Sequence, residues 1–313
     1  MKIYIIGHKS PDLDCISSAV EYAEFLKKTK RYDGAEIIPA RAGEPNKETM
    51  HIFSKFNATM PVFIDSCEID PEDAFVLVDH NELSQRSQKV VSEQVIEIVD
   101  HHKINVDFQA PLRIDVRPLG STSTLIYELF EMYGLKPSKE TLGLIVSSIL
   151  SDTQGLRSST TTGMDSDIVH KIARELKLDM EKLVFEIFKA KSDIEGLTPE
   201  EIVKKDFKIF DFGGKKVYIG QLETVEPEKL ISQKDVLIKT LESVKSKEGA
   251  GYGFLFITDI LKVNSQVIYT NDEERKLVEK AFITVGRDGV ADAGPRTSRK
   301  KDIAPAIEAA IKV

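Results

Sequence analysis

The stretch Gly7-His8-Lys9-Ser10-Pro11-Asp12-Leu13-Asp14 decides the fold of this chain. It follows the apolar run Ile3 to Ile6, which predicts a buried β-strand, and apolar residues at helical spacing come directly after it. Its histidine and two aspartates therefore lie in the turn at the C-terminal end of a strand, where open α/β sheets bind their ligands. The stretch predicts an α/β fold with a metal site at this edge of the sheet.

Two further apolar runs end on the same kind of residues. The run Ala74 to Val78 leads into Asp79-His80-Asn81, and the run Val95 to Val99 leads into Asp100-His101-His102. An isolated Asp-His pair often caps a turn or a helix, and this remains the alternative for each segment taken alone. Three such segments together predict one shared site. Carboxylates and imidazoles without a thiolate cluster favour Mg²⁺ or Mn²⁺ over structural Zn²⁺.

The other histidines are not expected to bind a metal. His51 lies in an apparent helix and is interpreted as structural, and His170 is typical of an exposed helical residue. His80 could be a ligand by its chemistry, but side chains alternate along a strand. We therefore expect His80 to support the site rather than to coordinate an ion.

The first part of the chain alternates short apolar strands with amphipathic helices, which predicts a mainly parallel sheet with helices on both faces. After the first helix a strand is expected around residues 35–40. Asp152 directly follows the second of four later helices and so comes from a helix end. These four helices are expected near residues 124–133, 139–150, 164–176 and 180–189.

A polar segment at residues 189–196 reads as a linker, so the expected domains are 1–188, a metal-binding catalytic unit, and 197–313, a smaller α/β unit. The second unit is expected to begin with a hairpin that turns at Gly213-Gly214. Its further elements are strands near 254–257 and 266–269 and helices near 235–245, 273–282 and 303–311.

Composition excludes several classes of protein. The 313 residues, 41% of them hydrophobic, suffice for two ordinary domains, and two cysteines cannot form a disulfide framework. No apolar segment has the length of a membrane span, so we expect a cytoplasmic protein without a membrane partner. A formal net charge of −8 argues against a general nucleic-acid binder, but not against a phosphate substrate held through metal ions.

The motifs, taken in order, resemble those of the DHH phosphoesterases, and most closely those of the family II (manganese-dependent) inorganic pyrophosphatases. Pro118 to Thr122 and Gln221 to Thr224 also agree with that family, and the resemblance spans nearly the whole chain. The motifs are His8-x-x-x-Asp12-x-Asp14, Asp79-His80-Asn81, Asp100-His101-His102, Ser151-Asp152-Thr153 and Ser298-Arg299-Lys300-Lys301.

The resemblance implies hydrolysis of pyrophosphate to two orthophosphates by a metal-activated hydroxide at a dinuclear Mn²⁺ centre. Mg²⁺ or Co²⁺ would also fit such ligands, and further Mg²⁺ is expected to arrive with the substrate. By this resemblance His8 and Asp12 hold one ion, Asp14 and His101 hold the other, Asp79 bridges them and Asp152 lies close to the second ion.

Two residues of the third motif are expected to act beside the metals. Adjacent residues at a strand end are expected to point apart, which leaves His102 free to face the substrate. The resemblance places His102 at the leaving-group side of the diphosphate, where an imidazolium could act as a general acid. Asp100 is expected to orient one of the imidazoles.

Basic residues of the second unit are the expected substrate contacts. Arg299 and Lys300 offer a planar fork and a point charge, which suit a diphosphate, and Lys208 matches a third basic residue of the family more loosely, since other lysines lie nearby. A solvated charge run ahead of a helix is the alternative for residues 299–301. The resemblance also implies an active site in the cleft between the domains, closure over substrate at the hinge, and a homodimer.

Other functions stay open at this point. An exopolyphosphatase or another DHH phosphoesterase is the first alternative, although the glycine-rich motif ending in histidine of the exonuclease branch is missing from this sequence. A metal-dependent phosphate sensor without turnover is a second alternative. It is disfavoured because every expected metal ligand is in place.

Overall fold

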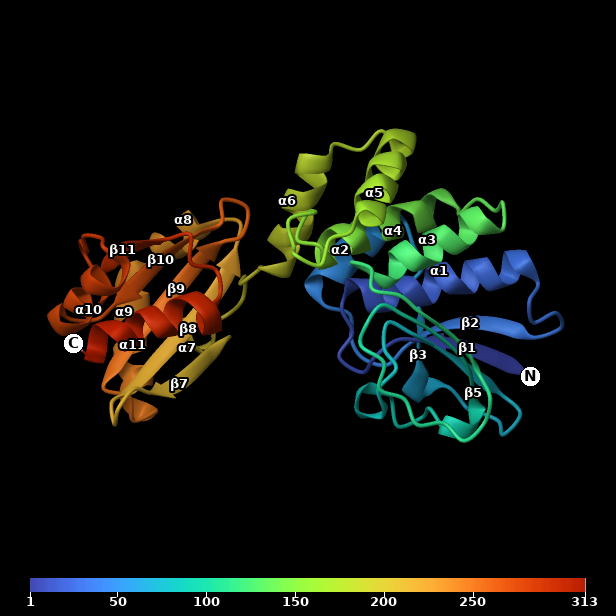
Figure 1. Ribbon diagram of the computed structural model, residues 1–313, viewed down its shortest axis with the longest axis horizontal. Coiled ribbons are helices and arrows are strands. Elements are labelled where there is room, and N and C mark those ends of the chain that lie inside the picture. The colour runs from blue at the N-terminus through green and yellow to red at the C-terminus, as the bar shows by residue number, and fades with distance from the viewer. Residues whose placement is uncertain (313) are drawn as a thin grey trace. The chain divides into compact units, whose positions relative to one another are not determined.

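The computed structural model describes residues 1–312. The chain forms two compact units, Met1–Lys191 and Ser192–Val313, each of which is an α/β structure (Figure 1). The helix α6 (Met180–Lys191) continues three residues into the segment predicted as a linker. The hinge role of that segment stays a prediction.

The first unit is built on a six-stranded sheet in the order β3-β2-β1-β4-β5-β6, in which every pair of neighbours is parallel. The strands predicted from the three apolar runs are confirmed, and β3 and β6 are additional. The strands are β1 (Lys2–Ile6), β2 (Glu36–Arg41), β3 (Val62–Phe63), β4 (Ala74–Val78), β5 (Val95–Asp100) and β6 (Arg113–Val116).

The strand order reverses direction between β1 and β4, because β2 and β3 follow β1 to one side and β5 and β6 follow β4 to the other. Right-handed crossovers then place the connections of the two halves on opposite faces of the sheet. A gap between neighbouring connections opens at such a reversal, at the carboxyl ends of the strands. The motifs after β1 and β4 therefore meet at this reversal.

One face of this sheet is covered by α-helices. Ile3 and Ile5 of β1 pack there with Phe25 of α1 (Leu13–Thr29) and Leu125 of α3 (Thr122–Met132). Further helices pack against these two and against one another (Figure 1). They are α2 (Lys47–Lys55), α4 (Lys139–Asp152), α5 (Gly163–Leu176) and α6.

The expectation of helices on both faces is wrong for this sheet. On the other face, Tyr4 and Phe75 pack with residues of irregular segments such as Val90 and Phe108. The connections at 79–94 and 101–112 hold no α-helix, only the short 3₁₀ turns η2 (Leu83–Gln85) and η3 (Ser92–Gln94). Apolar residues of these irregular connections, such as Val90 and Phe108, cover this face in place of helices.

The second unit contains a mixed five-stranded sheet in the order β11-β10-β9-β8-β7. The predicted hairpin is confirmed as the antiparallel pair β7 (Phe207–Asp211) and β8 (Lys216–Thr224), whereas β8 and β9 are parallel. The other strands are β9 (Tyr252–Asp259), β10 (Asn264–Tyr269) and β11 (Val290–Gly294).

Helices cover both faces of the second sheet. Alternate residues of β9 divide between two cores, with Phe254 and Phe256 on one face and Leu255 and Ile257 on the other. The first face is covered by α10 (Asp272–Phe282) and α11 (Ala304–Lys312), and the second by α7 (Pro199–Lys204), α8 (Pro227–Ile231) and α9 (Lys234–Lys247). None of the helices described in either unit is long and apolar enough to cross a membrane.

Gly143 sets the distance between the helix that ends on Asp152 and the end of α2. A Cβ at Gly143 would lie 2.2 Å from the ring of Phe56, the residue that caps α2. In an exposed helix, Gly→Ala would stabilise by about 0.5–1 kcal/mol. We expect Gly143→Ala instead to lower the free energy of unfolding by about 1–3 kcal/mol through overpacking, measured by urea denaturation.

Gly163→Ala is the matched control, because Gly163 is also helical and a Cβ there would meet nothing within 4 Å. It should not lower the free energy of unfolding. Equal stability of the two variants would contradict the packing argument.

Candidate metal centre

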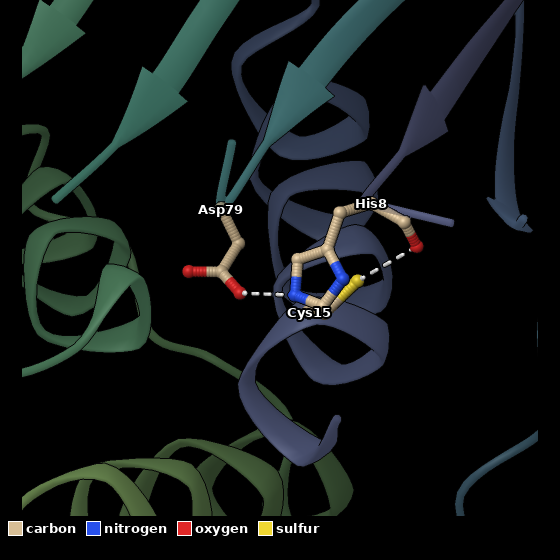
Figure 2. A group of neighbouring side chains, drawn as sticks. All are labelled: His8, Cys15 and Asp79. Carbon is tan, nitrogen blue, oxygen red and sulfur yellow. Dashed lines mark hydrogen bonds and ion pairs between the residues drawn. The ribbon is translucent and has the colours of Figure 1, made fainter. Parts of the chain in front are cut away.

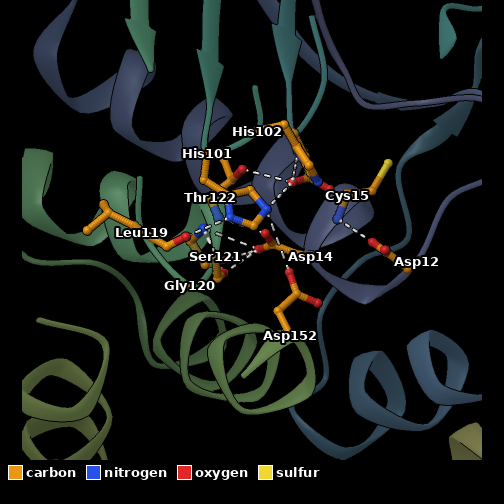
Figure 3. Close-up of polar contacts among 12 residues, drawn as sticks. Asp12, Asp14, Cys15, His101, His102, Leu119, Gly120, Ser121, Thr122 and Asp152 are labelled. Atoms are coloured by element: carbon orange, nitrogen blue, oxygen red, sulfur yellow. Dashed lines mark hydrogen bonds and ion pairs between the residues drawn. The ribbon is translucent and has the colours of Figure 1, made fainter. Parts of the chain in front are cut away.

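The six predicted ligands all belong to the first unit and converge at the reversal of its strand order. Figure 2 shows two of them, His8 and Asp79, and Figure 3 shows Asp12, Asp14, His101 and Asp152. Three come from the turn after β1 and the start of α1, one follows β4, one follows β5 and one ends α4. They are His8, Asp12 and Asp14, then Asp79, His101 and Asp152.

Asp79 lies at the middle of this group and is 2% exposed. Its Oδ2 is 3.5 Å from Nε2 of His8 (Figure 2), and its Oδ1 is 3.4 Å from Nε2 of His101. Each oxygen thus faces a different imidazole. Asp79 has a φ of 59°, a left-handed conformation that aspartate tolerates better than most residues and that often marks functional sites.

His101 is held with one ring nitrogen free for the site. Its Nδ1 is 2.9 Å from the carbonyl oxygen of Leu119, so Nδ1 donates and Nε2 faces Asp79 and Asp152, the latter at 4.0 Å. A backbone partner on the second nitrogen is the usual way in which a metal-binding histidine is oriented.

The ligand atoms are grouped closely enough to share cations. Three sets have their ligand atoms within 4.8 Å of one another: His8 with Cys15 and Asp79, Asp79 with His101 and His102, and Asp14 with His101 and Asp152. Ligand atoms at about 2.0–2.2 Å from one octahedral ion lie roughly 3 Å apart. The oxygen-rich donor set therefore fits Mn²⁺ or Mg²⁺, with small adjustments of side chains.

Asp14 is held by the first residues of α3. Its Oδ2 accepts from the backbone N–H of Thr122 at 2.7 Å, and its Oδ1 accepts from the hydroxyls of Ser121 at 2.8 Å and Ser123 at 2.7 Å (Figure 3). The Thr122 hydroxyl also donates to Oδ1 of Asp79 at 2.8 Å. These hydroxyl residues were not predicted as part of the site, although a serine and threonine run at a helix start is a recognisable capping signal.

Asp12 has a structural duty besides its place at the site. Its Oδ1 caps α1 by accepting from the backbone N–H of Cys15 at 3.0 Å, and it lies 3.8 Å from Nε2 of His8. Cys15 is buried beside the site, which the sequence did not indicate, and its thiol donates to the His8 carbonyl (Figure 2). A side chain at Gly7 would meet the Cys15 sulfur, so only glycine fits there.

The electrostatics of the group are those of a site built for cations. Burial would raise the pKa of Asp79, but hydrogen bonds from His101 and His8 lower it. Burial and the charge of Asp79 raise the pKa of Asp14 to about 6, and burial with the neighbouring carboxylates raises the pKa of Asp152 well above its usual value. Burial would lower the pKa of His101, but Asp79 and Asp14 raise it to about 10. In the metal-free protein, protons on these groups offset the negative charge that bound cations would otherwise offset.

His102 lies at the exposed side of the group, with its side chain 52% exposed. Its Nδ1 is 2.9 Å from Oδ1 of Asp100 and 3.8 Å from Oδ1 of Asp79. The hydrogen bond to Asp100 is the main cause that raises the pKa of His102. The premise that His101 and His102 point apart is wrong, because their rings lie 4.2 Å apart: β5 ends at Asp100 and strand alternation ends with it.

The remaining histidines are accounted for by the structure. His80 is buried, its Nδ1 is 2.9 Å from the Val78 carbonyl, and it belongs to none of the metal-binding groups found in residues 1–312. His170 lies on α5 with an exposed side chain, as the sequence predicts. His51, interpreted as structural, lies on α2 and is also exposed.

The basic residues predicted as substrate contacts lie in the second unit. Lys208 is on β7, and Arg299 and Lys300 begin a π-helical turn, η4 (Arg299–Ile303), whose start is capped by the Ser298 hydroxyl. Nη2 of Arg299 donates to Asp206 at 2.8 Å, and Nη1 is buried without a hydrogen-bond partner within the described chain. Single-turn π-helices are frequent at functional sites.

Comparison with known families divides the chain as its fold does. Residues 2–149 match the DHH family, N-terminal domain, and residues 185–310 match the DHHA2 domain.

Full-length relatives carry one recurring name. A manganese-dependent inorganic pyrophosphatase of Methanocaldococcus jannaschii is 37% identical over 98% of both chains, and one of Methanothrix thermoacetophila is 34% identical over 99% of this chain and 98% of the relative. A crystal structure of a family II inorganic pyrophosphatase from Methanococcus jannaschii aligns over both full chains with a TM-score of 0.61 at 35% identity. An exopolyphosphatase-related protein of Bacteroides fragilis shares the fold, with a TM-score of 0.53 at 17% identity over 99% of this chain and 92% of that one.

Replacing Asp79 by Asn tests whether this carboxylate serves the whole metal group. Asn also tolerates the left-handed backbone, so the change removes charge with little strain. We expect the affinity for Mn²⁺ to fall by more than the roughly 10- to 100-fold that changes to outer residues cost, measured by calorimetry and metal analysis. His51→Ala, on α2, should change neither quantity. Full Mn²⁺ occupancy in Asp79→Asn would contradict the arrangement.

The raised pKa of His101 predicts that Mn²⁺ binding releases protons. Below about pH 10 the metal-free site holds a proton on His101, which a bound cation must displace. The apparent affinity for Mn²⁺ should therefore rise with pH between about 6.5 and 8, by up to roughly tenfold per unit for each proton displaced. Calorimetry in buffers of different ionisation enthalpy counts these protons. An affinity independent of pH would show that the prediction is wrong.

Proposed function

Because this chain belongs to the family of manganese-dependent inorganic pyrophosphatases, with a DHH domain followed by a DHHA2 domain, we propose that it hydrolyses inorganic pyrophosphate to two orthophosphates. It is then a phosphoanhydride hydrolase whose metal ions are Mn²⁺ in the first instance. The observation that carries the proposal is the position of Asp79, whose two oxygens face the two imidazoles of His8 and His101.

We assign the metal ligands from this geometry. Asp79 is the carboxylate suited to bridge two ions, His8 and Asp12 lie on the side of its Oδ2, and His101 lies on the side of its Oδ1 with Asp14 and Asp152. When bound, such ions activate water as a nucleophile at neutral pH and neutralise phosphate oxygens. Mg²⁺ and Co²⁺ suit the same donors, and further Mg²⁺ would accompany the substrate.

His102 is the proposed proton donor to the leaving phosphate. It is the most exposed imidazole of the centre, and Asp100 fixes its Nδ1, so that Nε2 is the nitrogen left for a ligand. The hydrogen bond to Asp100 raises the pKa of His102, which favours the protonated ring that a proton donor requires. Asp100 also accepts from the backbone N–H groups of His101 and His102, so it holds this turn as well as the ring.

Arg299, Lys300 and Lys208 are the proposed diphosphate contacts. The Arg299 guanidinium, whose Nη1 has no hydrogen-bond partner among residues 1–312, and the exposed ammonium groups of Lys208 and Lys300 are donors to which phosphate oxygens can bind. We propose that they reach a substrate bound at the metals when the segment 189–196 lets the two domains close, so that water is excluded during the reaction.

The setting of the enzyme is part of the proposal. Both cysteines are free, as expected in a reducing cytoplasm. The strand β6 lies at the edge of the sheet and exposes Ile114, a surface that a second copy would cover in a homodimer.

Hydrolysis assays test the substrate. The full chain with Mn²⁺, and separately with Mg²⁺, is given pyrophosphate, tripolyphosphate, long polyphosphate and a nucleoside monophosphate, and phosphate release is measured. We expect the highest kcat/KM for pyrophosphate, because few basic residues serve the site and they suit two phosphates. A higher kcat/KM for polyphosphate or the nucleotide would replace this function by that of another DHH phosphoesterase.

The basic residues should separate substrate binding from metal binding. Arg299→Ala and Lys300→Ala should each lower kcat/KM by about ten- to a hundredfold, since a charge-assisted contact is worth about 1.5–3 kcal/mol. Mn²⁺ affinity should not change, because neither residue belongs to a metal-binding group among the described residues. Wild-type kcat/KM in both variants would mean that residues 299–301 are a solvated charge run.

A further inference from the structure

Glu21 is a buried acid close to the metal centre that the proposed mechanism does not use. It lies on α1, two turns after the ligand Asp14, and is 0% exposed. Its Oε1 lies 3.0 Å from the hydroxyl oxygen of Ser123, and its Oε2 has no hydrogen-bond partner in the described part of the chain. A buried ionised carboxylate normally has a cation or several donors, and Glu21 has neither among the contacts found.

The hydroxyl of Ser123 joins Glu21 to the metal ligand Asp14. Its oxygen is 2.7 Å from Oδ1 of Asp14 and 3.0 Å from Oε1 of Glu21. Both are hydrogen-bonding distances between oxygens, and each needs one proton. A serine hydroxyl supplies only one. The second proton must therefore belong to one of the two carboxyl groups.

Asp14 is not the group that carries it. Asp14 accepts from the backbone N–H groups of Thr122 and Ser123 and from the hydroxyl of Ser121, all of which favour its ionised form. The charges that act most strongly on Glu21 are those of Asp14, Glu24 and Asp79, and all three are negative. The second proton therefore belongs to Glu21.

We infer that Glu21 is a neutral carboxylic acid in the working protein and a positioning residue for Asp14, donating to Ser123 so that the Ser123 hydroxyl is directed at Asp14. Burial, followed by the charge of Asp14, raises the pKa of Glu21 well above its usual value, in agreement with the proton count. The inference rests on the proposed function only in taking Asp14 as a metal ligand. The proton on Glu21 would remain when metal ions bind, because Glu21 is not itself one of the proposed metal ligands.

Glu48 provides a natural contrast. It too is 0% exposed and next to a serine, with its Oε1 2.5 Å from the hydroxyl of Ser151. There, however, the ammonium of Lys191 donates to the Ser151 oxygen at 3.1 Å and lies 3.9 Å from Oε2 of Glu48. One hydroxyl proton and one ammonium account for these two hydrogen bonds, so the proton count requires none on Glu48. Oε2 of Glu48, like that of Glu21, has no hydrogen-bond partner in the described part of the chain, but Glu48 has the Lys191 cation to pair with.

The test is Glu21→Gln, which puts an N–H donor in place of the O–H and removes no charge if the acid is neutral. Infrared difference spectra of the full-length, Mn²⁺-loaded protein should show the carbonyl stretch of a protonated carboxyl group in the wild type and not in E21Q. Glu48→Gln should keep that band, and Ser123→Ala should shift it, because the acid loses its acceptor. Mn²⁺ affinity of E21Q, measured by calorimetry, should stay within about twofold of the wild type.

Two results would overturn the inference. One is a protonated-carboxyl band that persists unchanged in E21Q. The other is a loss of Mn²⁺ affinity in E21Q of about tenfold or more, the size expected when an outer residue of a metal site loses its function. Both readouts are independent of which phosphate compound is hydrolysed, so a failure of the pyrophosphatase proposal would appear in the hydrolysis assays and not here.

Discussion

The repulsion among carboxylates gathered in one buried place is the constraint on which the first unit depends. Asp14, Asp79 and Asp152 lie close together in a largely buried region. Without nearby positive charge, their carboxyl groups could not all ionise. The metal-free protein compensates with the imidazoles of His8 and His101, which face Asp79 from two sides. Dications bound between these carboxylates would remove the repulsion more fully. Relief of that repulsion therefore contributes to the affinity of the site for metal ions.

Hydrogen bonds at the N-terminal ends of two helices hold the aspartates in place against their mutual repulsion. The start of α3 points its first N–H groups and hydroxyls at Asp14 and Asp79, and a helix N-terminus favours negative charge. Asp12 caps the start of α1 and also lies at the metal centre. The same residue therefore begins a helix and offers a carboxylate oxygen to the site. These hydrogen bonds position Asp12, Asp14 and Asp79 within the first unit. The basic residues that we propose as substrate contacts come from a hairpin and a π-helical turn of the second unit. In the proposed function, recognition of substrate charge is therefore separated from binding of the metal ions.

Several features could be predicted from the sequence because they depend on local patterns. The apolar runs before Gly7, Asp79 and Asp100 are strands, and a helix does end at Asp152. The side of the sheet on which connections run could not be predicted in this way, because it depends on strand order, and the chain at 79–94 and 101–112 covers one face without helices. The closeness of the His101 and His102 rings was also not predicted. The strand β5 ends at Asp100, so the alternation of side chains does not extend to these two residues.

The sequence by itself determined the chemistry of this protein: which residue types follow the strands, in which order, and hence a cation site of oxygen and imidazole ligands at a sheet edge. Only the tertiary structure decided which of these residues contact one another. The reversal between β1 and β4 brings Asp79 between two imidazoles, and the packing of α1 on α3 sets Ser123 between Asp14 and Glu21. Such contacts join residues between 22 positions apart (Asp79 and His101) and 109 positions apart (Asp14 and Ser123), so their geometry depends on packing, which no local pattern records.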